Sequence, residues 1–340
     1  MSDGRHPDLT GGPSPAGGPD PVRIHLWRIG VEVLDRSIAH YEDLASTTRH
    51  GHVLVDDASD ADLVLFTQAH VCPDPLSLRA FRSSEPWRRF PDRCFVVDFR
   101  DRPWCAFPGL YTSMPARHFQ PRWQRAWLYP WIDEPSFLPM RSTDPDLLFS
   151  FVGGRTHSCR DPILSLTSDR ALIEDTSGFD HLDESPEAER RRQNFRTAVR
   201  RSKFVLCPRG HGTSSFRLQE VLAAGRVPVI ISDEWVEPSG PDWTAATVRW
   251  PESRAAALPG HLDGLEARFD EMATAGAALY DQWFSAELMF DRIIDQLLSI
   301  DRGQRFPARG IRGRRYGRLA LASARGRAVR RLSPSREGRG

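Results

Sequence analysis

Residues 204–238 read FVLCPRGHGTSSFRLQEVLAAGRVPVIISDEWVEP, and this stretch decides the predicted fold. Its apolar run Phe204–Cys207 predicts a strand, and the loop after it contains glycines that allow close backbone approach. A helix is expected over 214–224, with Gly225 as its left-handed stop. The run Val227–Ser232 predicts the next strand, so the stretch forms a β-loop-α-β unit.

The loop and the first helical turn of this unit carry groups that suit an anion. Arg209 precedes the turn and Arg217 lies in the helix, so both can give charge-assisted hydrogen bonds to one anion. Ser214 or Ser215 is the expected N-cap, where free N–H groups favour a diphosphate. Glu220 lies on the same helix face as Arg217 and can accept bonds from ribose hydroxyls. The alternative is an ordinary structural unit with an intrahelical Arg217–Glu220 pair.

Compact apolar runs recur outside this unit and predict an α/β protein with two domains. ADLVLF at 61–66, CFVVDF at 94–99 and LLFSFV at 147–152 are typical of buried parallel strands, and helices are expected between them. The Pro-, Trp- and Tyr-rich segment 108–139 is interpreted as packed loop and crossover. The predicted parts are a disordered leader over 1–21, an N-terminal α/β domain over 22–145, a C-terminal α/β domain over 146–300 and an Arg-rich tail over 301–340.

Charge is distributed unevenly along the chain. Residues 301–340 hold 13 arginines against two acids, a balance of +11, so the other 300 residues carry −10 of the net charge of +1. The tail is interpreted as a solvated extension, and the sharper hypothesis is peripheral contact with an anionic membrane. A polyanion-binding module led by the tail is the alternative, but the acidic body argues against it, and no specific nucleic acid partner is expected.

Cysteine usage and hydropathy give an expected location. The five cysteines have irregular spacing and no CxxC pair, which favours free thiols in a reducing compartment. Residues 1–20 lack the apolar core of a signal peptide, and no run approaches the ~20 apolar residues that span a bilayer. We therefore expect a cytoplasmic protein, with peripheral binding at the inner face of the membrane as the sharper alternative.

Two stretches, SKFVLCPRGHG at 202–212 and FRLQEVLAAGRVPVIISDEWVEP at 216–238, resemble the C-terminal signature of the exostosin family. A weaker resemblance covers FVGGR at 151–155, with Arg160 beyond it. Arg226 stands where the family usually has a small or apolar residue. The residues in register with the signature are Cys207, Pro208, Arg209, Gly210, Arg217, Glu220, Gly225, Pro228, Val229, Ile230, Asp233 and Pro238.

The resemblance implies a soluble, bacterial inverting glycosyltransferase with two facing Rossmann-like domains, the GT-B architecture. It implies a nucleotide sugar, most often UDP-linked, as donor, and a hydroxyl acceptor such as a glycan, a lipid-linked glycan or a natural product, as in polysaccharide biosynthesis. Arg209 and Arg217 are expected to bind the diphosphate, Glu220 the ribose, and Arg155 the leaving-group charge. The implied donor-binding residues are Gly153, Gly154, Arg155, Arg160, Arg209, Gly210, His211, Ser214, Ser215, Arg217, Glu220 and Asp233.

No cofactor is required by this chemistry, because fixed positive groups can stabilise the departing nucleotide without a metal. The DxD triplets at 60–62 and 144–146 precede strand candidates and are interpreted as surface loops rather than metal ligands.

The acceptor hydroxyl needs a base, which the N-terminal domain is expected to supply. Asp98 and Asp101, at the end of the CFVVDF run, are the first candidates, and His70 is the next. For each of them, a solvated loop residue or a local salt bridge is the alternative. Two further functions stay open: a non-catalytic sugar-nucleotide or glycan-binding protein, and a glycosyltransferase of a different two-domain family.

Overall fold

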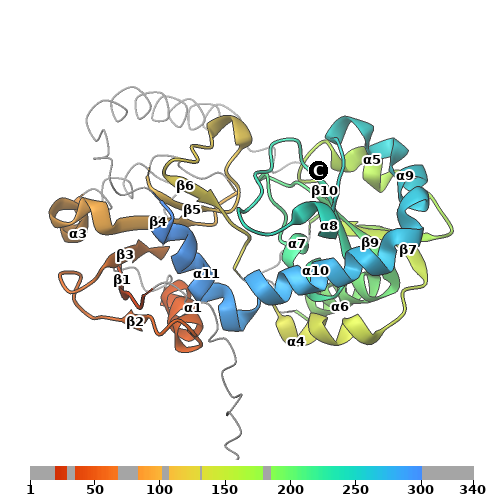
Figure 1. Cartoon of the computed structure of the whole chain (residues 1–340). Coiled ribbons are helices and arrows are strands. Elements are labelled where there is room, and N and C mark those ends of the chain that lie inside the picture. Colours follow the sequence, from red (N-terminus) through yellow and green to blue (C-terminus); the bar gives the residue numbers. More distant parts are fainter. Residues whose placement is uncertain are drawn as a thin grey trace, which may run out of the picture.

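The computed structural model describes residues 20–28, 35–67, 83–101, 107–130, 132–178 and 185–300. Two sheets, each built of parallel strands, form the two halves of the molecule (Figure 1). The N-terminal sheet has the order β2-β1-β3-β4-β5-β6, and the C-terminal sheet has the order β11-β10-β9-β7-β8. The first strand of each sheet lies between the second and the third, which is a doubly wound order. The predicted fold class, α/β with two Rossmann-like domains, is confirmed.

The N-terminal strands are β1 Arg23–Leu26, β2 Val53–Leu54, β3 Leu63–Phe66, β4 Cys94–Asp98, β5 Gly109–Tyr111 and β6 Gln124–Ala126. The helices among and after them are α1 Asp35–Ser46, α3 Glu85–Arg89 and α4 Glu134–Phe137, with the 3-10 turns η3 Pro91–Arg93, η4 Ala116–His118 and η5 Leu138–Ser142.

The C-terminal strands are β7 Leu147–Gly153, β8 Ala171–Asp175, β9 Ser202–Pro208, β10 Val227–Ile231 and β11 Val248–Arg249. The helices are α5 Arg160–Leu164, α6 Pro186–Arg201, α7 Arg217–Ala223, α8 Trp243–Ala246, α9 Leu258–Leu265, α10 Phe269–Trp283 and α11 Ala286–Leu298, with the 3-10 turns η6 Glu252–Ala257 and η7 Glu266–Arg268.

Two sequence expectations need correction. The segment 108–139, interpreted as loop and crossover, contains the strands β5 and β6. Each has only three residues, which is too short for a periodic apolar pattern to reveal. The helix expected over 214–224 begins later, at Arg217, and its N-cap Phe216 makes no side-chain capping bond. Its predicted left-handed stop is present, since Gly225 has φ 63°.

The position of strand β9 in the sheet explains why its sequence is an unbroken apolar run. Phe204 and Leu206 face a core shared with α9 and α10, while Val205 and Cys207 face the core that contains α6 and α7. Successive side chains of a strand point to opposite faces, so a strand covered on both faces needs apolar residues at every position. This is the arrangement that makes the C-terminal sheet an interior element.

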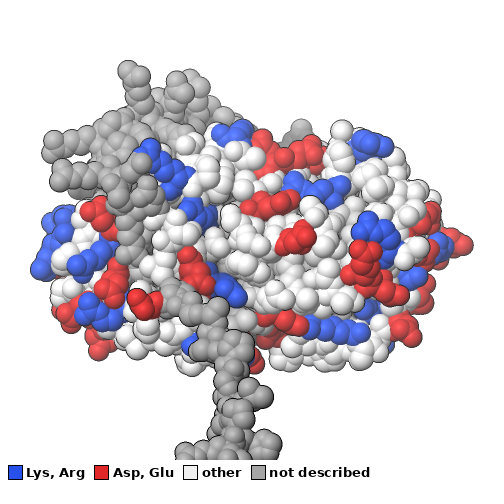
Figure 2. Space-filling model, in the orientation of Figure 1, with Lys and Arg blue, Asp and Glu red and all other residues white. Residues whose placement is uncertain are grey.

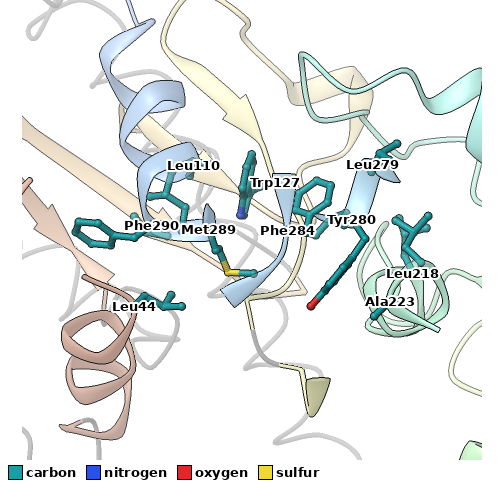
Figure 3. Close-up of a cluster of buried hydrophobic side chains, with 14 of the residues drawn as sticks. Leu44, Leu110, Trp127, Leu218, Ala223, Leu279, Tyr280, Phe284, Met289 and Phe290 are labelled. Atoms are coloured by element: carbon teal, nitrogen blue, oxygen red, sulfur yellow. The ribbon is translucent and has the colours of Figure 1, made fainter. Parts of the chain in front are cut away.

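The largest apolar cluster is continuous between the two halves (Figure 3). It joins Leu44 and Leu110 of the N-terminal half to Leu218 of α7 through Phe284 and Phe290. Helix α11 contacts α1 and β5, so the last described helix packs on the N-terminal sheet. The predicted boundary assigned these residues to the C-terminal domain. The difference arises because helical periodicity identifies an apolar face and says nothing about which sheet covers it.

Arg226 fixes the segment between the two sheets. Its side chain is buried, and its Nη2 donates to the carbonyl oxygens of Met140 at 3.0 Å, Thr143 at 2.9 Å and Arg200 at 2.9 Å. Burial lowers the pKa of Arg226 to about 10. The departure from the family pattern at this position therefore serves to hold the crossover against α6.

Charged groups of both signs are interspersed over the visible face of the molecule (Figure 2). Among the described helices, none combines the length and the apolar character that crossing a bilayer requires.

Candidate functional site

The site is built where the strand order of the C-terminal sheet reverses. Strands β7 and β9 are hydrogen-bonded neighbours, although β8 lies between them in the sequence and pairs on the other side of β7. In open α/β sheets, ligands bind outside the carboxyl ends of strands at such a switch point. The glycine-containing segments after β7 and after β9 meet at this edge, where Arg160 donates to carbonyls of both.

Arg160 connects the two loops. Its Nε donates to the carbonyl of Arg209 at 2.8 Å, its Nη1 to that of Gly154 at 2.9 Å, and its Nη2 to that of Pro208 at 3.0 Å. Burial lowers the pKa of Arg160 to about 10. A Cβ at Gly210 would lie 3.2 Å from Nη2 of Arg160, so a glycine fits this turn better than a larger residue. Arg160 therefore positions the two loops, since each of its three nitrogens donates to a loop carbonyl.

The loop 209–214 holds buried polar atoms that have no hydrogen-bond partner among the described residues. They are Nε of Arg209, Oγ1 of Thr213 and Oγ of Ser214. Leaving a buried donor or acceptor unsatisfied costs about 1–3 kcal/mol. The nearest carboxylate oxygen to Arg209 is Oε1 of Glu252, 3.9 Å from Nη1, which is a weak contact. Buried groups of this kind are satisfied by a ligand or by ordered water, so the loop could give three partners to a bound anion.

Arg217 and Glu220 form a pair on the first turn of α7. The Nη1 atom of Arg217 is 3.3 Å from Oε2 of Glu220. The Arg217 guanidinium also stacks on the ring of Phe195 from α6, 3.7 Å from its centroid, which holds it in one plane. Burial raises the pKa of Glu220, and Arg217 opposes that rise. The two side chains are thus held together at the edge of the same site.

Asp101 of the N-terminal domain lies against the loop after β9. A Cβ at Gly212 would lie 2.9 Å from Oδ1 of Asp101 and 2.5 Å from Oγ of Ser113, so the two domains touch closely here. The negative charge of Asp101 also raises the pKa of Arg160 against the effect of burial. The fold therefore brings together one predicted base and the predicted donor loop.

A chain of hydrogen bonds fixes the Asp101 carboxylate. Tyr129 Oη donates to Oδ1 of Asp101 at 2.7 Å, and it lies 2.6 Å from Oγ of Ser113. Because Tyr129 has one hydroxyl hydrogen, Ser113 must donate to Tyr129, and Ser113 accepts from the amide of Ser214 at 3.3 Å. Burial raises the pKa of Tyr129, and Asp101 raises it further, which keeps the phenol a donor.

The ring of Phe216 covers this network. It stacks on Tyr129 with a centroid distance of 3.8 Å and an interplanar angle of 28°. Phe216 is 49% exposed, whereas Tyr129 is buried, so an aromatic face lies open at the junction of the two domains.

Other predicted donor residues lie further from this centre. Arg155 is half-exposed and pairs with Asp161 and Asp175, each at 2.8 Å, so both ends of its guanidinium are occupied. His211 is exposed. Asp233 is exposed, and its amide donates to Oε1 of Glu252 at 2.9 Å, an interaction that ties the ends of β10 and β11 together. Nothing in these contacts singles out the three side chains for the donor.

The remaining predicted positions have the following surroundings. Ser215 Oγ accepts from the amide of Arg217 at 3.3 Å. Asp98 is buried at the end of β4, where Nε of Arg100 donates to both of its carboxylate oxygens, at 2.9 Å and 3.1 Å. This local salt bridge is the alternative that the sequence analysis kept open for Asp98. His70 lies outside the described residues.

Comparison with known families adds an independent observation. Residues 135–263, which include β7, β9, β10 and β11, match the family model of the exostosin GT47 domain. This segment is similar to the exostosin GT47 domain. The exostosin resemblance predicted from the sequence is confirmed over this segment, which contains Arg160, Arg209, Arg217 and Glu220.

Curated exostosins are also similar to this chain over a limited segment. The chain is 34% identical over 97 residues to the exostosin-1 homolog of Caenorhabditis elegans, covering 27% of this chain and 25% of the relative. It is 42% identical over 65 residues to exostosin-1 of Drosophila melanogaster, covering 18% of this chain and 8% of the relative. The chain thus spans a quarter or less of the length of these two exostosins.

Solved structures resemble the whole chain more distantly. One is HepE of Anabaena in complex with UDP and glucose, at 10% identity and a TM-score of 0.41, covering 82% of this chain and 100% of that one. Another is an alpha1,3-fucosyltransferase with GDP-fucose, at 14% identity and a TM-score of 0.36, covering 86% of this chain and 94% of that one. Both TM-scores are low, so the fold class rests on the strand order of the chain itself.

Several residues of the site were not predicted from the sequence, both in the exostosin-like segment and in the N-terminal domain that faces it. Phe216 stood within the decisive stretch, between an expected cap and Arg217, but its role became visible only through Tyr129. Tyr129 and Ser113 lie in the segment interpreted as loop. Glu252 follows β11, and no spacing in the sequence relates it to Arg209.

Proposed function

We propose that the protein is an inverting glycosyltransferase that moves a sugar from a UDP-linked donor to a hydroxyl acceptor. The observation that carries the proposal is the loop 209–214, whose buried polar atoms lack partners beside two arginines. Phosphate oxygens are strong acceptors with negative charge and would satisfy these groups. The exostosin match over 135–263 supports the transfer reaction.

Arg209 and Arg217 are the proposed diphosphate ligands. During transfer the bond between the anomeric carbon and the phosphate oxygen breaks, and negative charge develops on the departing nucleotide. Fixed positive groups stabilise that charge, an effect typically worth 10²–10³-fold in rate per donor. Arg160 adds positive potential while it holds the two loops. Glu220 is proposed to accept from the ribose hydroxyls, and its contact with Arg217 would orient both groups.

Asp101 is the proposed base. In an inverting transfer the acceptor oxygen forms a bond to the anomeric carbon from the face opposite the leaving group, and its proton passes to a carboxylate. Tyr129 donates to Oδ1 of Asp101, which leaves Oδ2 for the acceptor hydroxyl. The contact with Gly212 supports a position near the donor loop. Asp98, occupied by Arg100, is a weaker candidate.

Thermal-shift screening against UDP, GDP and TDP and their sugars tests the donor. A ligand that binds the native state raises the melting temperature by mass action, by RT ln(1 + [L]/Kd) in free energy. We expect UDP and at least one UDP-sugar to raise it. If only GDP, TDP or their sugars raised the melting temperature, the donor would carry a nucleobase other than uracil. No shift with any of them would contradict the proposal, and binding without turnover would indicate a non-catalytic binder.

The acceptor and the location stay predictions. A lipid-linked acceptor would agree with the predicted contact of the Arg-rich tail with an anionic membrane, which concerns residues outside the described part of the chain. Sedimentation of the full chain and of a chain lacking 305–340 with anionic liposomes, at low and high salt, tests the contact. Equal partitioning of the two proteins would refute it.

A further inference from the structure

Three metal-ligating side chains meet beside Arg209, and the sequence analysis assigned none of them to a site. His157 lies between β7 and α5, Cys159 is the N-cap residue of α5, and Glu252 follows β11. One ligand atom from each lies within 4.8 Å of the other two. The Nδ1 atom of His157 is 3.8 Å from Oε2 of Glu252. Strand order thus brings together residues that are almost a hundred positions apart.

The imidazole of His157 is arranged to offer a lone pair. The amide of Cys159 donates to Nδ1 at 3.3 Å, so Nδ1 is the unprotonated nitrogen and Nε2 carries the hydrogen. A hydrogen bond of this length is weak. A metal ion can therefore replace the amide at Nδ1 without removing a proton from the ring.

Cys159 and Glu252 can supply the balancing charge. Cys159 is buried, and its Sγ is the ligand atom that lies within 4.8 Å of those of His157 and Glu252. A bound cation would displace the thiol proton, and the thiolate with the carboxylate would balance two positive charges. Oε1 of Glu252 accepts from the amide of Asp233 at 2.9 Å, which leaves Oε2 facing His157.

We propose that His157, Cys159 and Glu252 form a binding site for a divalent transition-metal ion, with zinc as the best match. A nitrogen, a sulfur and an oxygen ligand suit zinc and cobalt, whereas magnesium and calcium prefer oxygen alone. Three protein ligands leave a fourth position open. The Nη1 atom of Arg209 is 3.9 Å from Oε1 of Glu252. A metal bound to Glu252 would weaken this contact and leave the Arg209 guanidinium available to a ligand of the loop 209–214.

Another histidine cluster in the described residues lacks this arrangement. Ligand atoms of His50, His52 and Asp291 also lie within 4.8 Å of one another. However, Nδ1 of His52 accepts from the amide of Val22 at 3.2 Å, so its hydrogen lies on Nε2, the nitrogen 3.8 Å from Oδ1 of Asp291. A metal at Nε2 would require the ring hydrogen to move to Nδ1, which would break the hydrogen bond from the Val22 amide. We therefore assign the ion to the His157 cluster alone.

Cobalt(II) is the probe for the experiment. The full chain is stripped with a chelator and titrated with cobalt(II) while its absorption is recorded. We expect a thiolate-to-cobalt charge-transfer band that saturates at one equivalent and disappears when zinc displaces cobalt. Cys159→Ser should lose the band, and Glu252→Gln should weaken cobalt binding about tenfold or more. Cys94→Ser, which alters a buried thiol in β4, is the matched control and should keep the band.

Absence of the band in the unaltered chain, or an equal band in Cys159→Ser, would overturn the proposal. If Cys159→Ser does not fold, alkylation of the unaltered chain gives the answer instead. Zinc should then slow alkylation of Cys159 and leave that of Cys94 unchanged, as read by peptide mass spectrometry. Equal alkylation of Cys159 with and without zinc would refute the site. No nucleotide is involved, so the outcome is independent of the proposed donor.

Discussion

The carboxyl edge of the C-terminal sheet and the facing part of the N-terminal domain differ in charge and in origin. The first presents Arg160, Arg209 and Arg217, which lie close together in the exostosin segment. The second presents one carboxylate, Asp101, held by Tyr129. In the proposed reaction, the positive edge serves the leaving group and the negative side serves the attacking hydroxyl. Under the proposed function, the C-terminal domain would hold the donor alone, whereas sugar transfer would need both domains.

The contact between the two regions is close but small. The amide of Ser214 donates to Ser113 across the junction, and Gly212 leaves no space for a Cβ beside Asp101. The apolar cluster that includes Phe284 holds the halves together elsewhere. Substitutions on either side of the junction should therefore separate binding from turnover.

The largest effect is expected on the negative side. Asp101→Asn removes the proposed base and should lower turnover by about 10²–10⁴-fold. Donor affinity should stay within about twofold, because the arginines of the other domain are unchanged. Steady-state transfer and calorimetric titration with the donor found by screening measure the two quantities. Asp43→Asn, on the exposed face of α1, is the control. Full turnover in Asp101→Asn would remove this residue from the mechanism and leave Asp98 and His70 as the remaining candidates.

The next effect is expected on the positive edge. Arg217→Ala removes charge-assisted hydrogen bonds, worth about 1.5–3 kcal/mol each, so UDP should bind about 10–150-fold more weakly. Calorimetric titration measures the affinity, and thermal unfolding checks that the variant folds. Arg190→Ala on α6, an exposed residue paired with Glu187, is the control. Retained UDP affinity in folded Arg217→Ala would contradict the diphosphate role.

A third prediction acts on the junction itself. Gly212→Ala places a Cβ 2.5 Å from Oγ of Ser113 and 3.0 Å from Cα of Asp101, so the domains must move apart. We expect a loss of about 1–3 kcal/mol in the free energy of unfolding, typical of overpacking. Gly260→Ala in α9 is the control, because its Cβ meets nothing within 4 Å and helix propensity should stabilise it by about 1 kcal/mol. Equal melting temperatures for the two variants would show that the junction is loose.

The smallest effect concerns pH. Burial raises the pKa of Glu220 in the folded protein, so the folded state binds this proton more tightly than the unfolded state. The free energy of unfolding therefore falls as pH rises from the unfolded pKa of about 4.5 through the folded pKa. Glu220→Gln lacks this loss, so its stability relative to the unaltered chain should increase with pH over that window. Urea unfolding at several pH values measures the difference in free energy of unfolding between Glu220→Gln and the unaltered chain. If this difference did not depend on pH, Arg217 would offset the burial cost of the Glu220 carboxylate completely.

Sequence patterns were sufficient to predict the features of the C-terminal edge that depend only on neighbouring residues. The apolar run of β9, the Arg217–Glu220 spacing and the stop at Gly225 each depend on residues within one turn or one strand, where periods of 2 and 3.6 residues operate. The short strand β5 was missed, because three residues contain too little periodicity to detect.

Relations between distant segments were decided by tertiary structure. Asp98 and Asp101 are three positions apart and equal as sequence candidates, yet one is bound by Arg100 and the other lies against Gly212. Residues 204–238 alone were enough to predict a β-loop-α-β unit that carries Arg209 and Arg217, because strand and helix periodicity and glycine conformation are local properties. Only packing of the two sheets decided which carboxylate faces that unit, because contact across domains depends on how whole elements are placed.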